Sequence, residues 1–186
     1  KEVDFGLLPS GDNSSIDTGL VIWERLKSLI DHSVNAGKLF SKELVSTYSL
    51  VYTSSFAGGV LAPDGSIHFV PYSAAVGQKI DSSGTVSTYS LVYTRSSAYS
   101  GGVLAPNGDI HFIPRSAAVG QKIDSSGTVS TYSLVYTIAN AYYGGVLAPD
   151  GSIHFVPTSA VVGQKIDFSG TVSTYSLVYT IANAYY

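Results

Sequence analysis

The sequence predicts a mainly β protein in which four-stranded antiparallel units follow an N-terminal amphipathic helix. The nonapeptide VSTYSLVYT occurs four times, starting at Val45, Val86, Val129 and Val172. Between its copies the hexapeptide GGVLAP recurs three times, so the chain contains a long internal repeat. Charged side chains are concentrated elsewhere, because residues 1–44 hold 12 of the 23 in the chain of 186 residues. A boundary near residue 44 therefore separates an N-terminal segment, 1–44, from a repeat region, 45–186.

The repeat region divides into three full units and one partial unit. Their bounds are 45–85, 86–128, 129–171 and, for the partial unit, 172–186. The second and third units differ at only ten of 43 positions. Units this similar should contain the same secondary-structure elements.

Each unit carries four strand signals. Counted from the first GGVLAP, they are GGVLAP (58–63), SIHFVP (66–71), AVGQKID (75–81) and TVSTYSLVYT (85–94), the last of which begins the next unit. Asp-Gly or Asn-Gly follows the first signal, and Ser-Ser-Gly or Phe-Ser-Gly follows the third; both are typical of hairpin turns that contain a residue with positive φ. The fourth signal is rich in β-branched and aromatic residues, which favour strands. Three hairpins predict a four-stranded antiparallel meander.

A unit of this length with four strands is typical of a β-propeller blade. A β-solenoid and a linear β-array are the alternatives, but a solenoid normally has shorter periods and no tight hairpins. Three complete blades follow one extra copy of the fourth strand, at 45–53. Because known propellers have at least about four blades, the chain is not expected to close a ring alone.

The extra strand at 45–53 predicts association between chains. It could complete a blade of another chain or pair with the open edge of the chain's own last blade. Two chains that make six blades are the simplest closed form, so we expect a homo-oligomer. A third alternative is that the gene product continues beyond Tyr186, where the next GGVLAP would begin.

The repeat GGVLAP(D/N)G.IHF(V/I)P resembles propeller-like repeats of marine bacteriophage proteins. The resemblance covers residues 45–186. It implies a virion protein that acts as a fibre, decoration or host-contact module, with other virion proteins as partners. Secretion to the extracellular space is the alternative localisation.

Residues 1–44 contain the predicted helix. Asp17 or Thr18 can cap its start and Gly37 can end it. Its apolar face includes Trp23, Leu26, Ile30 and Val34. We expect this face, together with Tyr48 and Tyr52, to serve oligomerisation or anchoring; packing within the protein is the alternative.

One histidine recurs in each blade, at positions 68, 111 and 154. Metal ligands converge with acidic or histidine partners, whereas each of these residues lies in a different blade. Hydrogen bonding between blades is therefore the expected role. Calcium at Asp64, Asn107 and Asp150 is disfavoured because isolated turns lack a dense ligand loop. No metal and no cofactor are predicted.

The motif QKID places Lys79, Lys122 and Lys165 two residues before Asp81, Asp124 and Asp167. Each pair therefore projects from one face of its strand. An aspartate directly before a Ser-Ser-Gly turn is expected to accept hydrogen bonds from backbone N–H groups of that turn. The aspartates are thus predicted to be turn caps.

Catalytic motifs such as GxSxG, HExxH or a phosphate loop do not occur. Polar groups are repeated almost unchanged, whereas catalysis needs a unique constellation. The sequence therefore predicts a non-catalytic binding or scaffolding protein. The formal net charge of −3 shows no basic excess for nucleic acid, and no apolar run reaches the roughly 18 residues of a membrane span.

Recognition is expected on the variable linkers and on one variable loop position. The candidate residues are Tyr72, Arg95, Tyr99, Arg115, Tyr142, Tyr143 and Thr158. Tyrosines of the fourth strand, such as Tyr89 and Tyr93, could stack on sugars or pack between blades. A lectin-like module with one glycan site per blade, and a host-surface glycan as partner, is the alternative function.

Overall fold

The computed structural model describes residue 27 and residues 47–53 and 56–180. The chain divides into two units, Lys1–Thr47 and Tyr48–Tyr186. The predicted helix lies outside the described residues except for Lys27, which is helical and exposed. Its proposed anchoring residues Trp23, Leu26, Ile30 and Val34 therefore also lie outside them. The fold described below is that of the second unit.

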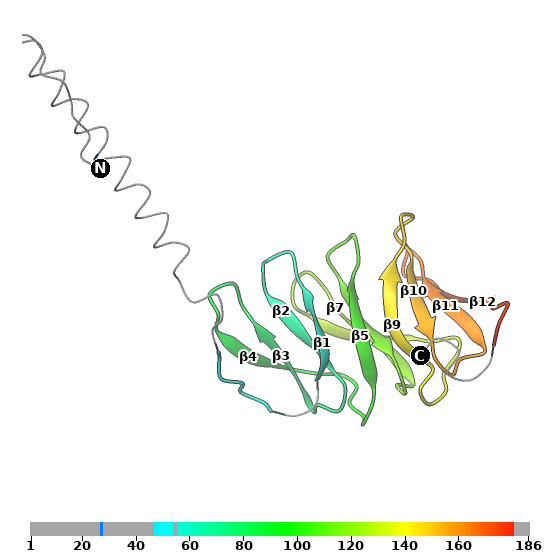
Figure 1. The fold of residues 1–186 in the computed structure, drawn as a ribbon, viewed down its shortest axis with the longest axis horizontal. Helices are drawn as coiled ribbons and strands as arrows, with labels where there is room; N and C mark the ends of the chain where they lie inside the picture. The colour runs from blue at the N-terminus through cyan, green and yellow to red at the C-terminus, as the bar shows by residue number, and fades with distance from the viewer. Residues whose placement is uncertain (1–26, 28–46, 54–55, 181–186) are drawn as a thin grey trace, which may run out of the picture. The chain divides into compact units, whose positions relative to one another are not determined.

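Three four-stranded sheets build the described part of the repeat region (Figure 1). Blade 1 contains β1 (Phe56–Leu61), β2 (Ile67–Pro71), β3 (Val76–Ile80) and β4 (Val86–Ser90). Blade 2 contains β5 (Tyr99–Leu104), β6 (Ile110–Pro114), β7 (Val119–Ile123) and β8 (Val129–Ser133). Blade 3 contains β9 (Tyr142–Leu147), β10 (Ile153–Pro157), β11 (Val162–Ile166) and β12 (Val172–Ser176). All neighbours pair antiparallel in chain order, which confirms the predicted propeller-type blades.

The two glycine-containing hairpin turns of blade 1 form at the predicted places. Between β1 and β2, Gly65 N–H donates to the Ala62 carbonyl at 3.0 Å. Between β3 and β4, Gly84 N–H donates to the Asp81 carbonyl at 2.9 Å. In both turns the glycine is the residue with positive φ that the prediction required.

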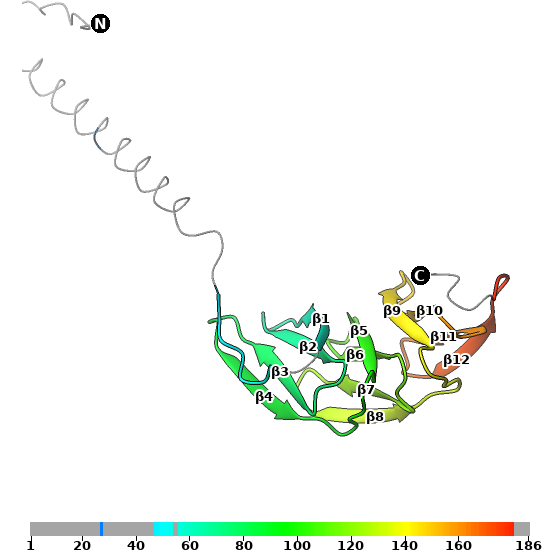
Figure 2. The same cartoon turned by 60° about the horizontal axis from the view of Figure 1, so that its bottom comes forward.

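The blades stack face to face, with the first strands β1, β5 and β9 next to one another (Figure 2). Glycines on these strands allow the close approach. A Cβ atom on Gly102 would lie 2.5 Å from Cγ2 of Val60 in blade 1, and one on Gly145 would lie 2.6 Å from Cδ1 of Ile113 in blade 2. An alanine at either glycine would push neighbouring blades apart.

The hydrophobic core lies between blades. One cluster joins blades 1 and 2 around Tyr99 and Phe112, and a second joins blades 2 and 3 around Tyr142 and Phe155. Tyr89, Leu91 and Tyr93 of blade 1, which could have faced a ligand, pack against the first cluster. Each blade therefore depends on its neighbour to cover its apolar side chains.

A buried glutamine on the third strand of each blade holds the connection from the preceding repeat. Gln121 Oε1 accepts hydrogen bonds from the N–H groups of Val92 at 3.0 Å and Tyr93 at 2.8 Å. Gln164 Oε1 does the same for Val135 and Tyr136. The sequence LVYT thus docks on the next blade rather than extending the fourth strand.

The first LVYT copy docks in the same way, which corrects the prediction of an extra strand at 45–53. Tyr52 N–H donates to Gln78 Oε1 at 2.7 Å, and residues 47–53 contain no strand. Each described blade already has four strands of its own, so no described blade lacks a strand that residues 45–53 would have to supply. Tyr48 is exposed and Tyr52 packs edge-to-face against Phe56 within the same chain.

Gln121→Met should destabilise the chain by about 1–3 kcal/mol, because it leaves two backbone N–H groups without an acceptor. Methionine is close to glutamine in size, and Nε2 of Gln121 has no partner to lose. Gln78→Met removes one such bond and is the matched control, expected to cost less. Urea unfolding of the full chain measures both; an equal stability of wild type and Gln121→Met would contradict the role of this side chain.

Candidate functional site

The candidate site is a cavity of about 290 Å³ between blades 2 and 3. It lies at the end of the blades where the β5–β6 and β11–β12 turns meet. Blade 2 contributes polar side chains and blade 3 contributes mainly two isoleucines and the β11–β12 turn. The lining residues are Ala105, Pro106, Asn107, Asp109, His111, Lys122 and Tyr132 from blade 2, and Gly151, Ile153, Ile166, Asp167, Phe168, Ser169 and Gly170 from blade 3.

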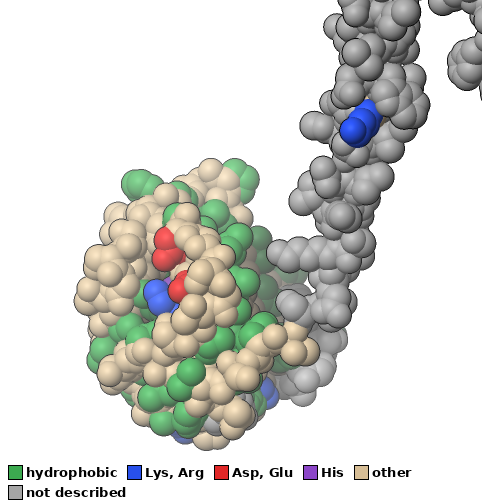
Figure 3. All heavy atoms as spheres, turned by 90° about the vertical axis from the view of Figure 1, so that its left-hand side faces the viewer, with side chains coloured by type: hydrophobic (Ala, Val, Ile, Leu, Met, Phe, Trp, Pro, Cys, Tyr) green, Lys and Arg blue, Asp and Glu red, His purple; other side chains and the backbone are tan. Residues whose placement is uncertain are grey.

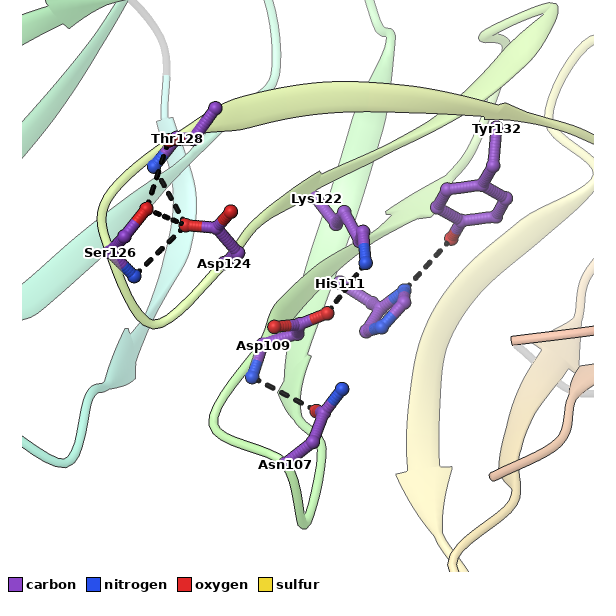
Figure 4. Close-up of polar contacts among 8 residues, drawn as sticks. All are labelled: Asn107, Asp109, His111, Lys122, Asp124, Ser126, Thr128 and Tyr132. Atoms are coloured by element: carbon purple, nitrogen blue, oxygen red, sulfur yellow. Dashed lines mark hydrogen bonds and ion pairs between the residues drawn. The ribbon is translucent and has the colours of Figure 1, made fainter. Parts of the chain in front are cut away.

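His111 on β6 contacts Tyr132 on β8 across the intervening strand (Figure 4). The Tyr132 hydroxyl lies 3.4 Å from His111 Nδ1. Its ring occupies the space that a Cβ atom on Gly120 of β7 would fill, so glycine is required there. The same pairs recur as His68–Tyr89 and His154–Tyr175. The histidines therefore bond within a blade, which corrects the expected bonds between blades.

His111 and Tyr132 are both uncharged at neutral pH. Burial lowers the pKa of His111 to about 4, and the positive charge of Lys122 acts in the same direction. Burial also raises the pKa of Tyr132 above its usual value of 10. His68 Nε2 in blade 1 lies 3.1 Å from Ser66 Oγ, but blade 2 has Asp109 in place of that serine, and no described residue is found hydrogen-bonded to His111 Nε2. This nitrogen is therefore free to bind a ligand.

Lys122 and Asp109 form a salt bridge of 2.6 Å, the one ion pair found in the described part of the chain. The Asp109 side chain is 8% exposed and that of Lys122 is 34% exposed. In blade 1 the corresponding turn carries Asp64, which instead accepts hydrogen bonds from Ser66 at the surface. Blade 1 has aspartate before the turn glycine and serine after it, whereas blade 2 has Asn107 before the glycine and Asp109 after it. The carboxylate of blade 2 therefore lies in the cavity rather than in solvent.

The aspartate before each β3–β4-type turn caps it as predicted. Asp124 Oδ1 accepts from Ser126 N–H, Ser126 Oγ and Thr128 N–H at 2.6–2.9 Å (Figure 4). These hydrogen bonds lower the pKa of Asp124. The turns at Asp81 and Asp167 repeat the pattern. The caps fix the turn that forms one wall of each cavity.

Phe168 distinguishes the cavity between blades 2 and 3 from its counterpart. Its side chain is 69% exposed and its ring lies against Gly151. The cavity between blades 1 and 2, of about 360 Å³, has Ser125 at this position and contains His68 and Lys79. Differences between the second and third units at positions 107, 109 and 125 thus fall on the cavity walls. That clustering is the sequence signal that could have identified this site.

The predicted recognition residues lie at the opposite end of the blades, in the linkers and the β2–β3-type loops. Tyr99 and Tyr142 are fully buried and Thr158 is 8% exposed, so these three do not form a surface. They are core residues because their rings or backbone bonds join the linker to the blade; Tyr99 OH, for example, donates to the Val119 carbonyl.

The remaining recognition candidates include a bonded pair. Arg115 donates from Nη1 to the Tyr72 hydroxyl at 2.7 Å and lies over its ring. Arg95 donates to the Ser116 carbonyl at 3.0 Å, and Tyr143 is 52% exposed. No described group of three or more His, Cys, Asp or Glu side chains is arranged to hold a metal. Nor does the described part of the chain contain a helix with the length and hydropathy of a membrane span.

Known structures share the fold, although no protein-family model and no curated protein sequence matches the chain. A catalytically inactive histidine-to-alanine variant of virginiamycin B lyase from Staphylococcus aureus, solved with quinupristin, is 21% identical with a TM-score of 0.62; the match covers 73% of this chain and 47% of the lyase. A streptogramin B lyase is 24% identical with a TM-score of 0.55, over 64% and 40%. An auxiliary nutrient binding protein from Bacteroides ovatus is 15% identical with a TM-score of 0.54, over 75% and 34%. The fold is a β-propeller, and this chain spans less than half of each of these proteins.

The lyases correct the prediction that the chain is not an enzyme. Propellers of this kind carry catalytic activity, so repetition of polar groups is no ground for excluding it. The premise of that prediction also fails in blade 2. Asp109 and its salt bridge with Lys122 have no counterpart in the other two described blades, which carry Ser66 and Ser152 at this position.

His111→Gln should remove part of the acid sensitivity of the fold. Because the pKa of His111 is about 4 in the folded chain and about 6.5 when unfolded, its contribution is present above pH 6.5 and decreases as the pH falls toward 4. The wild type should lose about 3 kcal/mol more than the variant over this interval. Urea unfolding at several pH values measures the difference, with His154→Gln as the control for loss of a His–Tyr bond. Parallel pH profiles of wild type and His111→Gln would contradict a buried neutral imidazole.

Proposed function

We propose that the chain binds a small, neutral, hydroxyl-rich ligand, of the size of one sugar unit, in the cavity between blades 2 and 3. The observation that supports this proposal most strongly is that Asp109, Lys122 and His111 line the cavity, while the exposed Phe168 ring lies at its opening. A concave site with a few polar groups and an aromatic ring is typical of small-ligand binding.

The polar groups favour hydroxyls over a charged ligand. Asp109 accepts hydrogen bonds, Lys122 donates them, and neutral His111 offers Nε2 in either role. Because the charges of Asp109 and Lys122 offset each other at 2.6 Å, a charged ligand would have to compete with an existing ion pair. A hydroxyl group both donates and accepts, so it can bridge these partners without disrupting the pair.

Phe168 supports a sugar ring rather than a linear polyol. Its exposed flat face can pack on the apolar face of a pyranose. The cavity between blades 1 and 2 has no aromatic residue at this position and no buried aspartate. The proposal is therefore one principal site, in place of the expected equivalent site in every blade.

A role in a virion is a separate proposal that rests on the repeat resemblance alone. Binding of a surface glycan would suit a host-contact module, and this is the form of the virion hypothesis that the cavity supports. Its test is the presence of the chain in purified particles.

The double variant Asn107→Asp/Asp109→Ser should lose ligand affinity at least tenfold, because it removes the buried carboxylate. The variant turn, Asp-Gly-Ser, is the sequence that forms the equivalent hairpin turns of blades 1 and 3, so the variant should keep the fold. Phe168→Ser, which reproduces the blade 2 turn, should lose roughly three- to tenfold through the stacking contact. Calorimetric titration of the full chain with a panel of monosaccharides measures these affinities.

Arg95→Ala, at the opposite end of the blades, is the control and should bind as the wild type does. If no sugar binds the wild type at millimolar concentration, or if both cavity variants bind as the wild type does, the proposal is wrong.

A further inference from the structure

We propose that a second copy of this chain stacks on the two open faces of the blade array, head to tail, and closes a six-bladed ring. This inference is independent of the ligand proposal. It rests on equivalent apolar side chains of the three blades. These side chains are buried at the two junctions between blades but are exposed on the outer faces of blades 1 and 3.

Blade 3 has one uncovered face, defined here as the exit face and including Val146. The equivalent residues are Val60, which is 7% exposed, and Val103, which is 9% exposed, because the next blade covers each of them. Val146 is 60% exposed. Tyr175 is likewise 38% exposed, whereas Tyr89 packs against the cluster between blades 1 and 2.

Blade 1 has the complementary uncovered face, defined here as the entry face and including Ile67 and Gly59. Ile67 is 39% exposed, whereas its equivalents Ile110 and Ile153 are 2% and 1% exposed. Figure 3 views the blades from this end, where hydrophobic side chains are spread among few charged ones. The entry face therefore has the composition of a surface that another blade covers.

The glycine positions show the same gap. A Cβ on Gly102 would meet Val60 and Val70 of the preceding blade, and one on Gly145 would meet Val103 and Ile113. At Gly59 the three atoms nearest to such a Cβ all belong to β2 of its own sheet. At Gly102 and Gly145 this space is filled by Val60 and Val103 of the preceding blade. No such valine lies among the nearest atoms at Gly59.

The occupant is a second copy because the exit face and the entry face are the two halves of an interface already formed between blades 1 and 2 and between blades 2 and 3. One chain therefore carries both halves of this interface. Rings made of three-blade chains contain multiples of three blades. Among the roughly four to eight blades of known propellers, only six satisfies this condition.

Only one of the two outer LVYT segments can bind Gln78 at a junction between copies. We call the docking site around Gln78 Oε1 the seat. It already binds the backbone N–H of Tyr52 of the same chain. At an internal junction that seat holds the segment that follows the fourth strand of the preceding blade, which for blade 3 is 177–180. The two LVYT segments are identical, so only one of them fits at a junction between copies. With 50–53 in the seat, 177–180 lies outside it.

The junction would also build a third kind of cavity. His154 and Lys165 of blade 3 correspond to His68 and Lys79, which line the cavity between blades 1 and 2. The opposite wall would come from Ile67 and Ile80 of the second copy, which correspond to Ile110 and Ile123. These polar groups of blade 3 are enclosed only when the second copy is present.

Sedimentation equilibrium of the full chain should give twice the chain mass of 19.5 kDa. Val146→Asp on the exit face and Ile67→Asp on the entry face should each weaken the dimer roughly a hundredfold, because each buries a charge in an apolar contact. Val135→Asp, on a linker and also 60% exposed before substitution, is the matched control and should leave the dimer intact. Circular dichroism checks that all three variants fold.

Mixing the two interface variants tests the head-to-tail geometry. Each retains one good face, so Val146→Asp and Ile67→Asp chains should together form a dimer through one junction. A face-to-face dimer would not be restored by mixing. A wild-type monomer at high micromolar concentration, or a dimer that both substitutions leave unchanged because residues 1–44 hold it, would overturn the proposal.

Discussion

Each described blade is a sheet whose apolar side chains are covered, at both internal junctions, by the neighbouring blade. This packing accounts for the positions of the core, since both clusters lie between blades and neither lies within one. It accounts for Gly102 and Gly145, which let the first strands approach closely. It also accounts for Gln121 and Gln164, because a connection that crosses between stacked sheets brings backbone N–H groups into a buried place and needs an acceptor there.

The candidate site is a by-product of the same stacking. Sheets that touch at their first strands leave room between the turns at one end, and the cavities occupy that room. Substitutions there change chemistry without disturbing the stack. Of the ten differences between the second and third units, Ile113 against Val156 is a core exchange, while Asn107, Asp109 and Ser125 change cavity walls. A duplicated blade can therefore acquire a specific site at little cost to its fold.

The repeat and its turn residues were sufficient to predict the blades, the pairing order and the aspartate caps, because these depend on local sequence. Alternation along a strand assigns side chains to a face but does not say what covers that face. Tyr99 and Tyr142 were therefore placed on a surface although they are core residues. The His111–Tyr132 pair was missed because it depends on Gly120 of the strand between them. Residues 45–53 were misread because likeness to the fourth strand does not show that a blade lacks one. Every described blade supplies its own fourth strand, and Tyr52 binds Gln78 instead.

Two segments of identical sequence, 50–53 and 177–180, could bind the same site at Gln78, and the covalent connection of the chain decides which one does. Because 50–53 and 177–180 have the same sequence, their contacts with a seat such as that of Gln78 would be nearly equal in energy. Only residues 54–55 separate the first segment from β1, whereas the second belongs to another copy at any junction between chains. A short tether gives the first segment an effective concentration in the millimolar range. At lower protein concentrations it therefore keeps the seat, and the blades of two copies can meet while their ends stay unexchanged.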